Sequence, residues 1–87
     1  MASRASYVLY FAVEAAEFLA QLSKSRQRRA LRLAQTLAAN PFVRSDYAVV
    51  DESGREQEHL LIEGFVYTYW LDHAVRELRI TDIEDAS

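Results

Sequence analysis

The chain has 87 residues, of which 51% are hydrophobic and 11% aromatic, and it contains two glycines, one proline and no cysteine. A chain of this length forms one hydrophobic core, so we expect a single domain over residues 1–87. The absence of cysteine excludes a disulfide scaffold, thiolate metal sites and a cysteine nucleophile, and it fits a reducing compartment such as the cytoplasm. With two histidines in the chain, we expect neither a metal site nor another cofactor.

The formal net charge of −3 conceals an uneven distribution of charged side chains. Residues 1–45 carry seven basic and two acidic side chains, whereas residues 46–87 carry three basic and eleven acidic ones. The net charge speaks against a general nucleic-acid binder, while the asymmetry creates local fields. Acidic residues interrupt every long apolar stretch, so we expect no membrane-spanning segment and no secretion signal.

The first half of the sequence predicts a strand followed by two helices. Residues 6–13 are rich in aromatic and β-branched side chains, which is typical of a strand. After Glu14 the apolar residues recur at helical spacing as Ala15, Phe18, Leu19 and Leu22. A second helix is predicted over 26–39, with Ser25 as its N-cap and Asn40–Pro41 as its end. Two helices with so short a joint predict an antiparallel helix hairpin.

The second half predicts four strands separated by tight turns. We place the strands at 47–50, 57–62, 65–71 and 75–83, and the turns at 51–54, 63–64 and 72–74. The element order is therefore β-α-α-β-β-β-β. Strands that cluster after the helices predict an α+β fold, in which an antiparallel sheet carries the helix hairpin on one face.

The strand at 65–71 predicts an accessible surface on the opposite face of the sheet. Val66, Thr68 and Trp70 point to one face, while the residues between them point to the other, and only one face can lie under the helices. Together with Leu61, these three residues are our candidates for partner binding. The alternative is that Trp70 packs under the C-terminal segment.

Arginines in the second helix form the strongest basic patch, which consists of Arg26, Arg28, Arg29 and Arg32. Such a patch can bind phosphates or an acidic protein surface. The alternative is a solvated helix face, docked in part against the acidic half of the same chain.

Three segments of the chain resemble the RelE/ParE superfamily of toxins from type II toxin–antitoxin systems. They are Tyr7-Val8-Leu9-Tyr10-Phe11 with the helix behind it, the helix end Leu37-Ala38-Ala39-Asn40-Pro41-Phe42, and Gly64-Phe65-Val66-Tyr67-Thr68-Tyr69 with the last strand. The resemblance implies a protein neutralised by a cognate antitoxin. RelE-like members cleave messenger RNA in the ribosome, and ParE-like members block DNA gyrase.

The expected catalytic arginine of the RelE-like nucleases is missing from this chain. The resemblance implies a basic residue at position 66, where this sequence has Val66, and further basic residues at positions comparable to Gln57, His59 and Leu61. RNA cleavage needs a base, an acid and a cation to stabilise the charge that develops on phosphate. The remaining catalytic candidates are His59, Arg76 and Arg79, while the neighbours Asp72 and His73 are better explained as turn residues.

Three hypotheses follow from the sequence. The first is a toxin-like protein, bound by a cognate antitoxin, that acts by protein contact with a target such as gyrase or has lost its activity. The second is an mRNA endonuclease with a rearranged site that uses His59 with Arg76 or Arg79. The third is a non-enzymatic α+β binding module that forms a homodimer.

Overall fold

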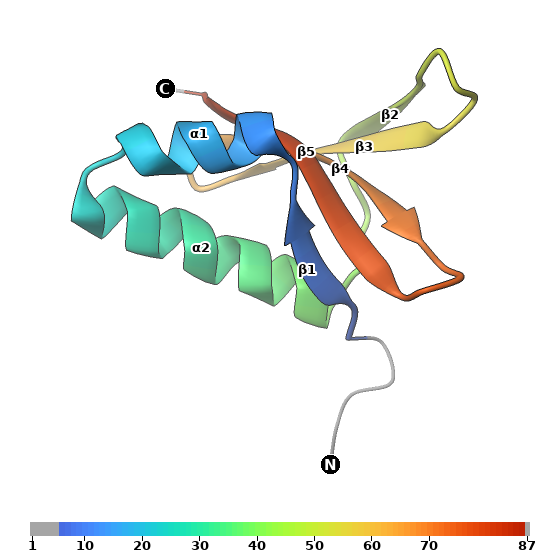
Figure 1. Cartoon of the computed structure of the whole chain (residues 1–87), viewed down its shortest axis with the longest axis horizontal. Coiled ribbons are helices and arrows are strands. Elements are labelled where there is room, and N and C mark those ends of the chain that lie inside the picture. Colours follow the sequence, from blue (N-terminus) through green and yellow to red (C-terminus); the bar gives the residue numbers. More distant parts are fainter. Residues whose placement is uncertain (1–5, 87) are drawn as a thin grey trace.

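The structure, a computed structural model, describes residues 6–86 and has the element order β-α-α-β-β-β-β (Figure 1). The elements are β1 (Val8–Phe11), α1 (Val13–Gln21), α2 (Lys24–Ala39), β2 (Tyr47–Val50), β3 (Glu56–Ile62), β4 (Phe65–Asp72) and β5 (Glu77–Asp85). The strands form one sheet in the order β1-β5-β4-β3-β2. The predicted α+β fold is confirmed. None of the helices described within 6–86 is long and apolar enough to cross a membrane.

The sheet is antiparallel except at one edge. Strands β2 to β5 pair with their sequence neighbours in antiparallel fashion, as predicted, whereas β1 pairs with β5 in parallel. The expectation of an antiparallel sheet is therefore wrong for this pair. The sequence gives no local signal for it, because β1 and β5 come from opposite ends of the chain and no tight turn connects them.

Several element boundaries differ from the prediction; the first strand, for example, spans Val8–Phe11 rather than 6–13, because α1 begins at Val13. Two of the differences have clear local reasons. Ser23, rather than Ser25, is the N-cap of α2, because its Oγ accepts a hydrogen bond from the Arg26 backbone N–H at 3.4 Å. The last strand begins at Glu77 rather than at Val75, because Arg76 has a φ of 56° and lies in the turn.

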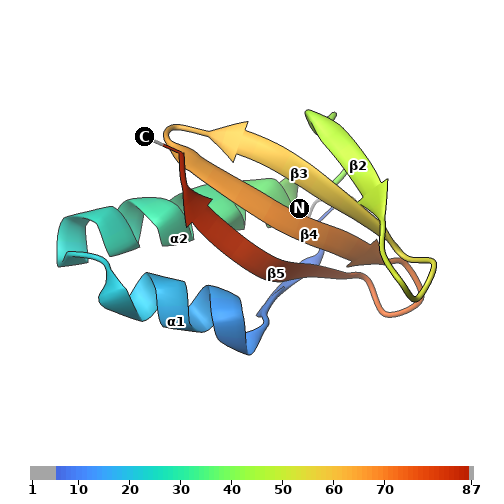
Figure 2. The same ribbon diagram turned by 90° about the horizontal axis from the view of Figure 1, so that it is seen from above.

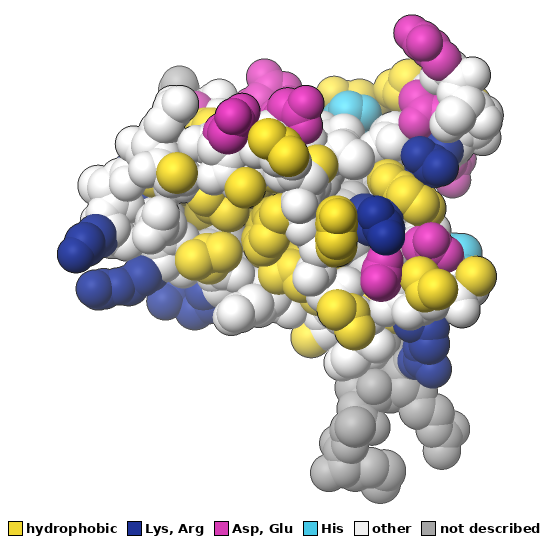
Figure 3. Space-filling model, in the orientation of Figure 1, with side chains coloured by type: hydrophobic (Ala, Val, Ile, Leu, Met, Phe, Trp, Pro, Cys, Tyr) yellow, Lys and Arg dark blue, Asp and Glu magenta, His cyan; other side chains and the backbone are white. Residues whose placement is uncertain are grey.

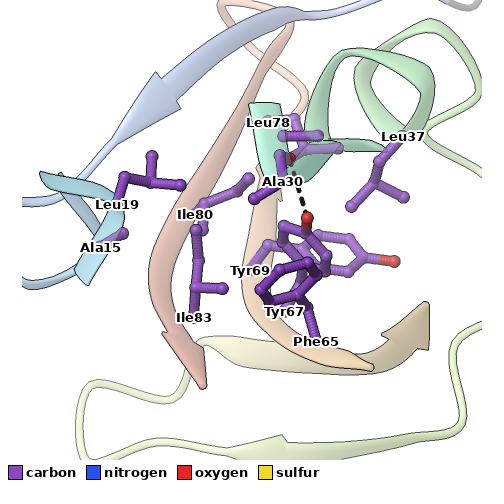
Figure 4. Packing of buried hydrophobic residues seen from close by; sticks show 11 residues of the cluster. Ala15, Leu19, Ala30, Leu37, Phe65, Tyr67, Tyr69, Leu78, Ile80 and Ile83 are labelled. Carbon is purple, nitrogen blue, oxygen red and sulfur yellow. Dashed lines mark hydrogen bonds between the residues drawn. The ribbon is translucent and has the colours of Figure 1, made fainter. Parts of the chain in front are cut away.

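Both helices cover the same face of the sheet, as Figure 2 shows from above. α1 contacts β5, and α2 contacts α1 and β1. The helices approach the sheet closely because their buried positions include the small residues Ala15, Ala30 and Ala34. The larger core side chains come from the strands, and Figure 4 shows how they pack; they are Phe65, Tyr67, Tyr69, Leu78, Ile80 and Ile83.

A β-bulge in β5 changes which residues face the core. Thr68 pairs with Asp82 and Tyr69 pairs with Ile80, so Thr81 is the extra residue of β5. Ile80 and Ile83 are consequently both buried although they are three residues apart. The same shift places Arg79 and Asp82 together on the face that the helices leave uncovered.

Tyr67 connects the sheet to α2 through a buried hydrogen bond. Its hydroxyl donates to the Ala30 carbonyl oxygen at 2.8 Å, which is the dashed line in Figure 4. Burial is the main cause that raises the pKa of Tyr67 to about 12, because the ionised phenolate would lose its hydration.

Replacing Tyr67 with Phe should lower the free energy of unfolding by about 1 kcal/mol at pH 7, because one buried hydrogen bond is lost. Since the folded-state pKa is raised, the wild-type phenol stabilises the fold below pH 10, and this contribution is lost as the pH rises toward 12. Urea unfolding at pH 7 and at pH 11 measures both effects. The half-exposed Tyr10 provides the control, and an equal loss in Tyr10→Phe would contradict the assignment.

Candidate functional site

The uncovered face of the sheet, which we call the open face, brings together the predicted partner-binding residues. Thr68 pairs with His59, and Val66 pairs with Leu61, so side chains of β3 and β4 lie in common rows. Phe65, Tyr67 and Tyr69 are buried under the helices, which leaves Val66, Thr68 and Trp70 on the open face. Leu61 is 55% exposed. This face therefore combines apolar side chains with access from solvent.

His59 is held in position at the centre of the open face. Its Nδ1 lies 3.1 Å from Thr68 Oγ1 in a hydrogen bond. Its ring stacks on Tyr47 of β2, with a centroid distance of 4.5 Å and an interplanar angle of 6°. These contacts from two neighbouring strands fix the plane of the imidazole. A fixed plane is required of a general base, but it is equally compatible with a purely structural histidine.

A row of alternating aromatic rings and guanidinium groups crosses the open face, and we call it the cation–aromatic row. The guanidinium of Arg79 lies 4.3 Å from the ring centre of Tyr10 and 5.6 Å from that of Trp70. The guanidinium of Arg55 lies 3.9 Å from the same Trp70 ring. Sequence reasoning missed Arg55, because it precedes β3 in a loop and no strand alternation assigns it to a face.

The catalytic candidates do not all share this face. Arg79 lies on it and forms an ion pair with Glu77 at 2.7 Å. Arg76 lies instead in the turn between β4 and β5, where its guanidinium is 5.7 Å from the Tyr7 ring. Of the two arginines predicted as alternative partners of His59, Arg79 therefore shares its face and Arg76 does not.

Carboxylates occupy the rows beside Val66 and Thr68. Glu84 pairs with Val66, and Asp82 pairs with Thr68, both from β5. Position 66 thus has an aliphatic side chain, with an acidic neighbour on one strand and Leu61 on the other. An RNA phosphate at this place would meet negative charge rather than a guanidinium.

The predicted basic patch is partly engaged by its own chain. Arg26 forms an ion pair with Asp85 at 2.6 Å, which raises the pKa of Arg26, and its guanidinium also lies over Phe65. Arg29 likewise lies over Phe65, and its buried Nε finds no acceptor among the described residues. Arg28 and Arg32 are exposed. Figure 3 shows basic side chains gathered over the start of α2.

Three of the similar solved structures are RelE-type toxins, alone or in complex with a partner. A chain of the toxin–antitoxin complex RelBE2 from Mycobacterium tuberculosis matches with a TM-score of 0.80 at 16% identity, over 100% of both chains. The archaeal RelE–RelB complex from Pyrococcus horikoshii OT3 matches with a TM-score of 0.72 at 14% identity, over 94% of this chain and 97% of that one. The isolated RelE toxin of E. coli matches with a TM-score of 0.72 at 12% identity, over 94% and 86%.

The chain has the RelE fold. Comparison of the sequence with family models finds no match, and comparison with characterised proteins finds none either. The resemblance predicted from three sequence segments is therefore confirmed at the level of the fold, over the whole chain. Within that RelE fold, Val66 stands at a position where the resemblance implies a basic side chain.

The neighbouring turn residues Asp72 and His73 do not form a dyad within this RelE fold. The Asp72 carboxylate accepts a hydrogen bond from the Ala74 backbone N–H at 3.2 Å, which stabilises the turn. His73 Nδ1 lies 2.8 Å from the Tyr7 hydroxyl oxygen in a hydrogen bond. Their interpretation as turn residues agrees with these contacts. Among residues 6–86 no group of three or more metal-ligating side chains is found.

Asp51 organises the loop that carries Arg55. Its carboxylate accepts hydrogen bonds from the Ser53 N–H and hydroxyl, the Arg55 N–H and the Gln57 amide, at 2.6–3.0 Å. These donors, with Ser53 the largest contributor, hold the pKa of Asp51 well below its ordinary value of 3.8. The charged carboxylate therefore fixes the backbone immediately before β3.

Replacing Asp51 with Ala should lower the melting temperature at pH 7, and the difference from wild type should shrink as the pH falls below about 4. The reason is that a carboxylate with a lowered folded-state pKa stabilises the fold above its unfolded-state pKa, near 3.8, and loses this effect as it protonates. Thermal unfolding at several pH values tests this. Glu52→Ala, an exposed carboxylate of the same turn, is the control. A pH-independent difference for Asp51→Ala would exclude the explanation.

Proposed function

We propose that this protein is the toxin-like component of a type II toxin–antitoxin module and that a cognate antitoxin binds its open face. The observation that carries the proposal is the RelE fold over the full chain, combined with an accessible sheet face of mixed apolar and aromatic character. Two of the similar structures described above, the RelBE2 complex and the archaeal RelE–RelB complex, hold the RelE-type protein together with a protein partner, which supports a protein partner for this fold.

The proposal includes the absence of the standard nuclease arrangement. Replacing a guanidinium with the isopropyl group of Val66 removes both hydrogen-bond donors and positive charge. The carboxylates of Asp82 and Glu84 beside it add repulsion for RNA phosphates. We therefore propose that the protein acts on its target by protein contact, as ParE-like toxins act on gyrase, or that it retains antitoxin binding alone.

Induced expression in a bacterium, with and without the adjacent reading frame, tests this function. We expect the adjacent product to bind the protein, and any growth arrest to be relieved by co-expression and to occur without transcript cleavage. Gyrase-dependent DNA damage separates the ParE-like mode from a protein that retains binding alone. Specific cleavage of ribosome-bound messenger RNA by the purified protein would contradict the proposal.

Leu61→Asp should weaken binding of the adjacent product at least about tenfold, because it introduces a charge into the apolar part of the open face. Trp70→Ala should weaken binding by a similar or larger factor, because buried tryptophans contribute strongly to interfaces. Calorimetric titration measures both. Val13→Asp places the same charge on the exposed surface of α1 and serves as the control. Equal losses of binding affinity in Leu61→Asp and Val13→Asp would contradict the open face as the binding site.

The second candidate function is an endonuclease with a rearranged site, and the fixed position of His59 favours it. His59 would act as the general base, and Arg79 of the same face would supply positive charge. If the protein cleaves ribosome-bound RNA, His59→Ala should reduce the rate at least about 100-fold. Cleavage that persists when His59, Arg76 and Arg79 are all replaced with Ala would exclude this site.

A further inference from the structure

The sheet splits at one end between β3 and β4. Their pairing ends at Glu58–Tyr69, while β4 continues to Asp72 beside β5, and β3 begins at Glu56 beside β2. Figure 1 shows the two hairpin ends pointing away from each other. The split leaves a hollow of about 380 Å³, which we call the end hollow. Its lining includes Phe42, Arg55, Glu56, Glu58, Trp70 and His73.

The charged groups of the end hollow lie on two sides of the sheet. Arg55 lies over the ring of Trp70, which belongs to the open face. Glu58 pairs with the buried Tyr69, so its side chain lies on the helix side, and Glu56 shares that side because it is two residues away. A positive group thus stands at one side of the split and two carboxylates stand at the other.

Aromatic rings form walls of the end hollow. The His73 ring stacks on Phe42 with an interplanar angle of 9°, and its hydrogen bond to Tyr7 fixes its orientation. Tyr7 also contacts Phe42 edge to face at 5.6 Å. This wall is assembled from the segment before β1, the α2–β2 loop and the β4–β5 turn. Trp70 provides a second ring, one face of which carries the Arg55 guanidinium. Flat faces of this kind stack on flat ligands.

We propose that the end hollow binds a mononucleotide whose base is guanine. Such a ligand carries an anionic phosphate at one end, for the Arg55 guanidinium, and a flat base at the other. Guanine presents two adjacent donors, N1–H and the 2-amino group, which match the two acceptor oxygens of the Glu56 carboxylate. The Glu58 carboxylate is less available, because its Oε1 accepts a hydrogen bond from the Ser45 hydroxyl at 2.6 Å. A free amino acid fits less well, because its ammonium and carboxylate groups are attached to one carbon atom and cannot reach both sides of the split.

The proposal does not rest on the toxin–antitoxin assignment, although the end hollow shares Trp70 with the open face. Trp70 is the only tryptophan of the chain, so its indole N–H gives a single nuclear magnetic resonance signal that reports on the end hollow. Titration of the full chain with guanosine monophosphate should shift this signal in a saturable way. Inosine monophosphate, which lacks the 2-amino group, should bind more weakly by about tenfold.

Variants of the lining residues test whether guanosine monophosphate binds in the end hollow. More than one variant is used, so that the binding test stays valid if one of them fails to fold. Glu56→Gln should weaken binding of guanosine monophosphate by about tenfold, because a charged acceptor is lost. Glu58→Gln should weaken it less, because the Ser45 hydroxyl already donates to the Glu58 carboxylate. Glu84→Gln makes the same change in charge at the other end of the sheet and should leave binding within about twofold. The remaining amide signals confirm that each variant is folded.

A trinucleotide that ends in guanosine distinguishes a free nucleotide from the end of an RNA chain. Binding of guanosine monophosphate at least as tight as that of the trinucleotide supports the proposal. Binding of the trinucleotide alone would overturn it. Equal shifts with guanosine monophosphate, inosine monophosphate and ribose phosphate would overturn it as well, as would the absence of a saturable shift.

Discussion

The alternation of side chains along β4 is the constraint on which the rest of the structure depends. Phe65, Tyr67 and Tyr69 fill the core under the helices, and the hydroxyl of Tyr67 reaches the backbone of α2. A strand in this conformation must send the intervening residues to the opposite side. The open face, with Val66, Thr68 and Trp70, is thus the necessary counterpart of the core and has the same rigid backbone.

The bulge at Thr81 determines the charges that accompany this face. Without it, Ile83 and Asp82 would exchange sides, and the core would lose a buried isoleucine to gain a carboxylate. With it, Asp82 joins Arg79 on the open face. The face consequently has an aromatic and cationic part around Trp70 and an acidic part around Val66, and a binding partner must accommodate both.

The same RelE fold is compatible with different chemistry because function depends on the side chains of the open face. A nuclease needs positive charge where the phosphate becomes more negative during cleavage. Here the guanidinium groups of Arg55 and Arg79 are engaged with aromatic rings, and Arg79 is further paired with Glu77. Arginines packed on aromatic rings suit the binding of a protein surface that has both apolar and charged groups, because interface anchors are commonly aromatic and arginine side chains.

The sequence by itself determined the element order, the α+β class and the two faces of β4, because these follow from local periodicity and turn residues. It placed Val66, Thr68 and Trp70 on one face for the same reason. The parallel pairing of β1 with β5 was decided by tertiary structure. The positions of Arg55 and of the end hollow were also decided by tertiary structure, because they depend on how two hairpins diverge in space. Contacts between distant segments leave no periodic trace in the chain, so local patterns cannot encode them.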